Sequence, residues 1–421
     1  MNEENLRERP TEPAPFSVLP RELPGAVLCY AAAYCYILYL DNPKWLPLTA
    51  ALLVGITELL HWNAKRSWES FIWLGCFVCA CIGGTLRRFG VWDGAQLALF
   101  IHIFFVWWVL ARSGKLAEGK SGHLLPLDAV NGFFVIPFGN FFLRLRSLIF
   151  AGKALLPKPE AGKKKRPWGW IAGAAVLCLL LFVGAVNLLM EADAGFGALL
   201  EGAAEWFRFD WDGIVWVRLL CSLPVGAWLF GLMGGSRRMS GERLARQRGS
   251  ISEALEKLKK VPGGFWTAVI AVFSALYLVF FVVQARYLFG AFTRTLPEGF
   301  IVSEYARQGF FELCKVMAVN FALLWLTTRM VSRDTAEQRS FLITCIVLLA
   351  ESMVFAVIAL SKLGLYISCF GFTPLRLQST WLVCVLLAGC GLWTYTLLTG
   401  RPVFRKWMIF GGVTLSVLCL F

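Results

Sequence analysis

The sequence has little charge and almost no histidine, and these shortages exclude several classes of protein. Only 16% of its 421 residues are charged and 3 are histidine, whereas 58% are hydrophobic. Soluble domains carry about 25% charged residues. The sequence also lacks an HExxH pair, a glycine-rich phosphate loop after a strand and a GxSxG nucleophile elbow. It therefore does not fit a soluble protein. An enzyme is the least supported class, and we predict no catalytic residue and no cofactor.

The ligand spacing of a metal site is also missing, although the chain has 13 cysteines. Most of them lie inside apolar runs, where cysteine behaves as a small apolar residue. Cys76, Cys79 and Cys81 come nearest to a motif, but a structural zinc ion needs four ligands and no second pair of matching spacing follows. We therefore predict that these cysteines pack between helices and that the chain has no metal site.

Long apolar runs are what the sequence has in abundance. They are about 16 to 27 residues long and are separated by short charged joints, as expected for helices that cross a hydrocarbon core about 30 Å thick. Lipid cannot satisfy backbone N–H and C=O groups, so each run must be helical. We predict an all-α, polytopic transmembrane bundle of about 11 spans. They lie at residues 25–40, 46–62, 70–86, 93–111, 168–190, 213–234, 263–285, 310–330, 340–362, 378–398 and 404–421.

The basic residues predict the orientation of this bundle. Most of the 41 Lys and Arg fall in joints that are cytoplasmic if the N-terminus is inside, so the chain is expected to be N-in and C-out. The basic runs at 162–170 and 236–250 adjoin spans on that side, where anionic lipid attracts them. Because no basic domain with interleaved aromatic residues is present, we predict contact with the lipid bilayer and no nucleic-acid partner. No protein partner is indicated.

The chain is predicted to divide into two membrane halves. Residues 1–24 are polar and proline-rich and are expected to be a disordered cytoplasmic lead-in. The first half, 25–234, has six spans, and the second, 263–421, has five. A basic cytoplasmic joint at 235–262, with a short surface helix, separates them. Residues 123–150 are apolar but broken by proline and glycine, so they favour an interfacial or shallow re-entrant element, with a half-helix lining a pathway as the alternative.

Two short stretches of the second half carry a family resemblance. They read VSEYARQGFFELCKVMAVN (302–320) and KLGLYISCFGFTPLRLQSTW (362–381). They resemble the paired signatures of a bacterial membrane-protein family, domain of unknown function 4173, which has a sister family, 4153. Phe370 stands where that family usually has a tyrosine. The resemblance implies a multi-pass protein of the bacterial inner, or plasma, membrane and no established activity.

The predicted topology brings both signatures to the outer leaflet. We therefore expect one outward-facing polar cluster, in which Glu312 and Lys315 pair at i, i+3 spacing. The cluster either binds an anionic or zwitterionic ligand or a lipid headgroup through Arg307 and Arg376, or locks spans together by ion pairs. Its expected members are Glu304, Tyr305, Arg307, Glu312, Lys315, Tyr366, Thr373, Arg376 and Trp381.

Glu351 is a separate candidate, because it falls near the middle of a predicted span. A carboxylate at that depth must be protonated, paired or hydrated. This residue makes a proton-coupled transporter the first alternative function. A non-catalytic membrane scaffold or sensor is the second. Glu58 and His61, near the inner end of the second span, are weaker candidates.

Overall fold

The structure is a computed structural model that describes residues 16–86, 90–155, 178, 213–259, 262–283, 302–331 and 338–421. Every regular element among these residues is a helix. The long helices are α1 (Glu22–Asp41), α2 (Leu46–Leu60), α3 (Trp68–Leu86), α4 (Gly94–Ser113), α7 (Leu143–Leu155), α10 (Gly213–Arg238), α11 (Gly241–Leu258), α12 (Gly263–Val283), α14 (Val302–Met330), α16 (Arg339–Phe370), α17 (Pro374–Thr399) and α18 (Phe404–Leu418). The short ones are η1 (Pro43–Trp45), α5 (Leu125–Val130), η2 (Asn131–Val135) and α6 (Ile136–Gly139).

Ten segments of the described chain are long and apolar enough to cross a membrane. They are Glu22–Asp41, Pro43–Leu60, Trp68–Leu86, Gly94–Ser113, Leu125–Gly152, Ile214–Arg238, Gly263–Val283, Phe310–Met330, Arg339–Phe370 and Pro374–Thr399. The predicted all-α polytopic fold is confirmed, and the chain is a multi-pass membrane protein. The predicted span at 168–190 lies outside the described residues. The span predicted at 404–421 corresponds to α18, which has 15 residues and is shorter than the ten.

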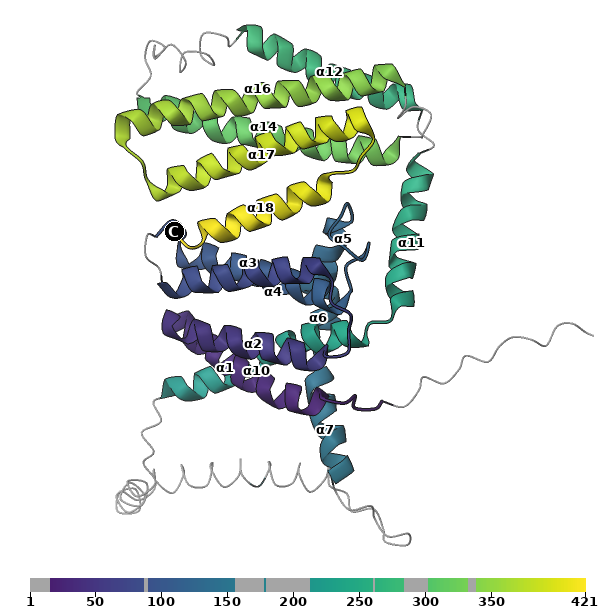
Figure 1. Ribbon diagram of the computed structural model, residues 1–421, viewed down its shortest axis with the longest axis vertical. Coiled ribbons are helices and arrows are strands. Elements are labelled where there is room, and N and C mark those ends of the chain that lie inside the picture. The colour runs from purple at the N-terminus through teal and green to yellow at the C-terminus, as the bar shows by residue number, and fades with distance from the viewer. Residues whose placement is uncertain are drawn as a thin grey trace, which may run out of the picture.

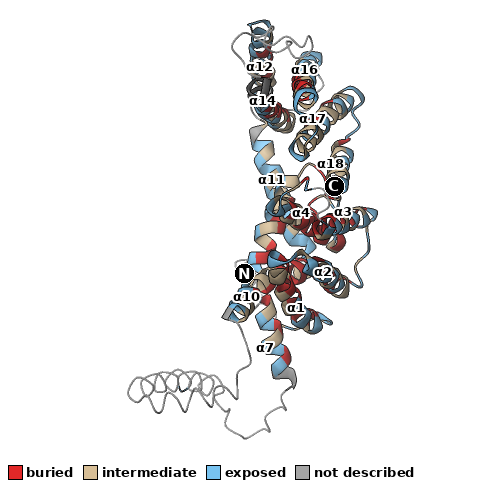
Figure 2. Ribbon diagram, turned by 90° about the vertical axis from the view of Figure 1, so that its left-hand side faces the viewer, coloured by how far each residue is buried: buried red, intermediate tan, exposed pale blue. Residues whose placement is uncertain are grey.

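The apolar helices run side by side and are stacked along the long axis of the molecule (Figure 1). Their buried residues form two separate clusters. One joins α1, α2, α3, α4 and α10, and we call these helices the N-terminal bundle. The other joins α12, α14, α16 and α17, the C-terminal bundle. Figure 2, which views the helices end-on, shows the buried residues where helices face one another.

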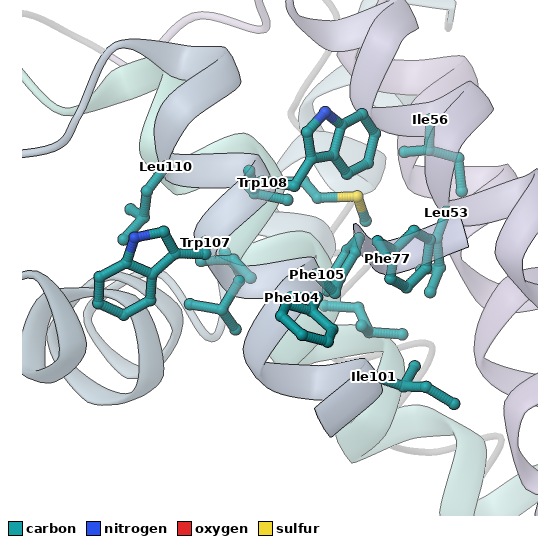
Figure 3. Packing of buried hydrophobic residues seen from close by; sticks show 14 of the residues in the cluster. Leu53, Ile56, Phe77, Ile101, Phe104, Phe105, Trp107, Trp108 and Leu110 are labelled. Atoms are coloured by element: carbon teal, nitrogen blue, oxygen red, sulfur yellow. The ribbon is translucent and has the colours of Figure 1, made fainter. Parts of the chain in front are cut away.

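Aromatic side chains fill the core of the N-terminal bundle (Figure 3). Phe77 of α3 is fully buried, and its ring is stacked on Trp108 of α4 with a centroid distance of 6.1 Å. Phe105 lies 5.5 Å from the same Phe77 ring. Large rings bury much apolar area and adopt few rotamers, so this packing fixes the distance between α3 and α4. The bundle is therefore a rigid support for the loops at its ends.

Helix α18 lies between the two bundles and contacts both α3 and α17. At its N-terminal end, Arg405 donates to the buried carboxylate of Glu69, with Nη2–Oε2 at 2.8 Å. On the opposite side of the membrane the bundles meet again, where Trp381 of α17 lies edge-on to Trp92, with centroids 6.3 Å apart. The last helix of the chain thus joins the bundles along their length.

Close packing of α3 against the end of α18 requires glycine at position 83. A Cβ atom there would lie 1.8 Å from the backbone oxygen of Cys419, whereas a Cβ at Gly75, on the same helix, would have no atom within 4 Å. We expect Gly83→Ala to lower the free energy of unfolding by about 2 kcal/mol or more, because the helices must move apart. Gly75→Ala should be neutral or slightly stabilising, since alanine favours the helix. Chemical denaturation of both variants checks this, and equal effects would contradict it.

Four helices run across the direction of the others, on the side where α1 begins. They are α5, α6, α7 and α11 (Figure 1). Residues 125–152 are long and apolar enough to span by length and composition, but a π-helical turn at η2 and a break after Gly139 divide them. The interfacial or shallow re-entrant element expected at residues 123–150 therefore stays a prediction. Helix α11 has 18 residues and is longer than the short helix expected in the joint.

Residues 1–24 were expected to be a disordered lead-in, but the last residues of this segment are helical. Helix α1 begins at Glu22, whose fully buried carboxylate accepts from Arg238 of α10 at 2.6 Å. The same guanidinium donates to the Ser17 carbonyl and lies 4.5 Å from the ring of Phe16. One arginine therefore orders this segment, and composition alone does not reveal so distant a partner.

Candidate functional site

A hydrogen-bonded polar network crosses the core of the C-terminal bundle. The Tyr277 hydroxyl of α12 donates to Asn320 Oδ1 of α14 at 2.7 Å, and Asn320 Nδ2 donates to Ser352 Oγ of α16 at 2.9 Å. All three side chains are buried. Hydrogen bonds in an apolar interior are strong and directional. The network therefore holds three spanning helices in register around one polar centre.

Glu351 lies beside this network and is 5% exposed. Neither carboxyl oxygen makes a hydrogen bond within the part of the chain that the structure describes. The polar side chains that interact electrostatically with Glu351 are Ser274 and Tyr277 of α12. Neither makes a hydrogen bond of normal geometry with it. At a rise of 1.5 Å per residue, Glu351 lies about 18 Å along α16 from Arg339. It is thus at mid-depth in the membrane, and the described residues give it no salt bridge there.

Aromatic rings close the space beyond Glu351, one turn further along α16. Phe355 is buried, with its ring 5.2 Å from Tyr277 and 4.7 Å from Phe281 of α12. These contacts place a layer of aromatic rings beside the polar network, on the side toward the C-terminal end of α16.

The first signature is described in part. The side chains of residues 302–309, which include Glu304, Tyr305 and Arg307, lie outside the described part of the structure. Glu312 and Lys315 are exposed, and the ion pair predicted between them is not formed. The charge of Glu312 acts instead on the buried Lys362 of α16. An i, i+3 spacing permits a pair but does not require one.

The second signature forms the turn between α16 and α17. Arg376 donates to the backbone oxygens of Phe370, at 2.9 Å, and of Gly371, and its guanidinium lies 4.2 Å from the Tyr366 ring centroid. Gly371 has a φ of +77°, which glycine adopts readily. Thr373 is the N-cap residue of α17. Arg376 thus satisfies carbonyl groups at the end of α16, and the arginine–carboxylate cluster expected around it is not among its described contacts.

Trp381, the last signature residue, is used to join helices. Its indole N–H donates to Thr414 Oγ1 of α18 at 3.0 Å. Neighbouring Gln378 donates to the Val91 carbonyl and lies 3.3 Å from Gln96 Oε1. Both contacts tie α17 to helices outside its own bundle. Trp381 was expected as a member of the outer polar cluster, and its role between helices was not predicted.

Sequence reasoning missed the buried arginine that binds Glu58 in the N-terminal bundle. Arg112 is 2% exposed and donates to both carboxylate oxygens of Glu58, at 3.0 to 3.1 Å, and to the carbonyls of His61 and Ala64. Glu58 was noted as a weak candidate, but Arg112 was assigned to a basic joint. Both residues lie near the predicted cytoplasmic end of a span, and this shared depth in the membrane could have indicated that they pair. These contacts connect the ends of α2 and α4, which is a structural role.

No group of three or more His, Cys, Asp or Glu side chains able to hold a metal ion is found among the described residues. A family model described as Domain of unknown function (DUF4153) matches residues 75–421. The signatures resembled the 4173 family, and the match falls on its sister. The matched region contains the whole C-terminal bundle and α18. No curated protein and no solved structure matches the chain.

Proposed function

Because the chain belongs to the DUF4153 family, whose description gives no activity, we propose its function from the geometry: it is a proton-coupled transporter in which Glu351 takes up and releases a proton. One observation carries this proposal, the buried carboxyl group without a hydrogen-bond or cationic partner among the described residues. An ionised carboxylate in that position is costly and a neutral acid is not. A change in the polarity around Glu351 therefore makes its carboxyl group bind or release a proton.

The polar network around Glu351 supports a coupled movement of helices. Tyr277, Asn320 and Ser352 come from α12, α14 and α16, so a change of charge at Glu351 acts on all three helices. Two other buried acids differ, since Glu22 and Glu69 each contact an arginine at 2.6 to 2.8 Å. The buried Asp128 accepts a hydrogen bond from the Ala117 N–H at 2.7 Å, although its second carboxyl oxygen has no described partner. Glu351 is the buried glutamate whose charge the described residues leave uncompensated.

The outward-facing headgroup site has weaker support as a function. Arg376 already uses its guanidinium on two carbonyl groups and a tyrosine ring, and Glu312 acts on Lys362. The contacts of Arg376 favour a structural role over the ligand pocket. Contact with anionic lipid is better supported at α11, where Arg243, Arg246 and Arg248 are exposed. We propose that the membrane is the bacterial plasma membrane and that α11 lies on its cytoplasmic face.

The proposal is tested by reacting the protein in lipid vesicles with dicyclohexylcarbodiimide, an apolar reagent that modifies protonated carboxyl groups, and mapping the product by mass spectrometry. We expect Glu351 to be modified, and less so as the pH is raised. Glu69 is the matched control, because it is similarly buried but contacts Arg405 at 2.8 Å. Failure to modify Glu351 at any pH, or equal modification of Glu69, would count against a proton site.

Transport itself is tested in vesicles that contain a pH-sensitive dye. A potassium diffusion potential should drive proton uptake by the wild type, and Glu351→Gln should reduce it to the rate of protein-free vesicles. Glu312→Gln, an exposed carboxylate on α14, is the control and should retain uptake. Modification of Glu351 without any Glu351-dependent uptake would leave a protonated structural residue and would reject the transporter.

A further inference from the structure

A cavity of about 200 Å³ lies between α14, α17 and α18 and is closed on one side by the loop before α5. This loop follows α4 of the N-terminal bundle and contributes His123 to the wall of the cavity. The lining residues of α14 and α17 belong to the last turns of those helices or lie just before them, and α18 contributes its first turn. These ends all lie on the side where α11 runs (Figure 1). The cavity therefore faces the predicted cytoplasmic side.

Aromatic rings form most of the cavity wall. Phe321 and Trp407 are stacked, with centroids 5.5 Å apart and planes at 6°. Trp393 lies 5.7 Å from Phe321, and Phe404 lies 5.7 Å from Trp407. The Trp407 indole N–H is held by the Val385 carbonyl, at 2.8 Å. The rings are thus fixed by one another, and they present flat apolar surface to an occupant.

Gly389 makes room for this wall. A Cβ atom at Gly389 would lie 2.9 Å from both Phe321 and Trp407. Glycine within a helix lowers its stability by about 1 kcal/mol relative to alanine. Its presence here is explained by the space that the two stacked rings need.

Arg329 supplies the positive charge of the cavity. Its guanidinium lines the cavity and makes no hydrogen bond or ion pair within the described chain, although the charge of Glu118 acts on it from a distance. This is unlike Arg112, Arg238 and Arg405, each of which contacts a carboxylate. A guanidinium that is half-buried without a partner is suited to an anion that arrives from outside.

His123 lines the same cavity as Arg329 and is neutral near pH 7. Its ring is stacked on Phe404, with centroids 5.0 Å apart. Burial lowers the pKa of His123, and the charge of Arg329 lowers it further, against an opposite effect of Glu118. Neutral imidazole both donates and accepts a hydrogen bond. The mouth therefore combines one fixed cation with one neutral polar ring.

We propose that this cavity binds an amphiphilic anion, with its carboxylate or phosphate group on Arg329 and its apolar body among Phe321, Trp393 and Trp407. An apolar pocket with a few convergent polar groups is the usual form of a small-molecule site. A cation is disfavoured, although aromatic rings attract cations, because Arg329 stands at the mouth. The anion is either a water-soluble aromatic or short-chain acid or a lipid with one acyl chain.

The test uses the full chain in phosphatidylcholine nanodiscs and measures the binding of 4-phenylbutyrate by equilibrium dialysis. The uncharged 4-phenylbutanamide has the same body and reports whether charge is recognised. We expect the acid to bind and Arg329→Gln to weaken it by about tenfold or more, the value of a charge-assisted hydrogen bond. Arg329→Lys should retain part of the binding, which shows that the position tolerates substitution.

Two control variants should bind as the wild type does. Arg401→Gln removes an exposed arginine from the loop between α17 and α18, close to the cavity in sequence. Glu351→Gln removes the proposed proton site, so its normal binding separates this proposal from the proposed function. Oleoyl-lysophosphatidate, added to the nanodiscs, distinguishes the source: displacement of phenylbutyrate assigns the site to a lipid anion, and no displacement assigns it to a soluble one.

Three results would overturn the proposal. One is equal binding of the acid and the amide, which would show that the charge is not recognised. Another is an unchanged affinity in Arg329→Gln. The third is the absence of binding by both the acid and oleoyl-lysophosphatidate.

Discussion

Replacing Arg112 with methionine is expected to lower the free energy of unfolding by about 3 to 5 kcal/mol, the usual cost of removing one partner of a buried ion pair. Arg112 is 2% exposed and makes hydrogen bonds to Glu58 and to the carbonyls of His61 and Ala64. Methionine fills a similar volume but satisfies none of these acceptors. The two carbonyl oxygens lose these hydrogen bonds, and Glu58 loses its buried cation but keeps its contact with Arg66.

Arg66 is the matched control, because its guanidinium contacts the same carboxylate, at 2.5 Å, but its side chain is 46% exposed. An exposed ion pair contributes about 0 to 1 kcal/mol, so Arg66→Met should have a small effect. Unfolding in mixed micelles with increasing denaturing detergent measures both variants. Equal losses for Arg112→Met and Arg66→Met would show that burial does not determine the contribution. The double variant Arg112→Met with Glu58→Gln should recover part of the loss, as coupled residues do.

Removing the ion pair between α18 and α3 is expected to lower the free energy of unfolding by a comparable amount. In Arg405→Met, the carboxylate of Glu69 keeps its hydrogen bonds from Trp73 and from the Ser121 backbone but loses its cation. Because Glu69 is 1% exposed, we expect a loss of about 3 kcal/mol or more. The adjacent Lys406→Met, an exposed position, should change the stability little.

Hydrogen exchange localises the effect of Arg405→Met. Protection should fall in α18 first, because the ion pair fixes its N-terminal end, and the core of the N-terminal bundle around Phe77 should remain protected. The aromatic cavity should also be affected, since Phe404 and Trp407 are part of its wall. Uniform loss of protection over both bundles would contradict a role at the junction between them.

The positions of the spans were accessible from the sequence, because the length of an apolar run must match the bilayer whatever the tertiary packing. Glu351 was accessible for the same reason: its depth follows from its place within a run. The partners of charged residues were not. Arg112 and Glu58 lie on α4 and α2, and Arg405 and Glu69 lie on α18 and α3, so their pairing depends on which helices are neighbours.

The outer polar cluster shows why local spacing misleads. Glu312 and Lys315 are correctly spaced for a pair on one helix, yet the charge of Glu312 acts on Lys362 of the adjacent helix. Arg376 was expected to bind an anion, but carbonyl groups at the end of its own helical hairpin are closer. The cavity at Arg329 was not predicted at all. Its wall combines His123 with three helices of the other half, and no short motif contains them.

The position of α18 has a consequence for how the protein is made. Membrane helices enter the bilayer in the order of synthesis, and α18 follows all other described helices. Until it is inserted, α3 has no partner for Gly83, and Glu69 lacks its arginine. Before that point the bundles can already contact each other through Trp381 and Gln378 of α17, and the close packing and the ion pair of α18 are added after the other described helices.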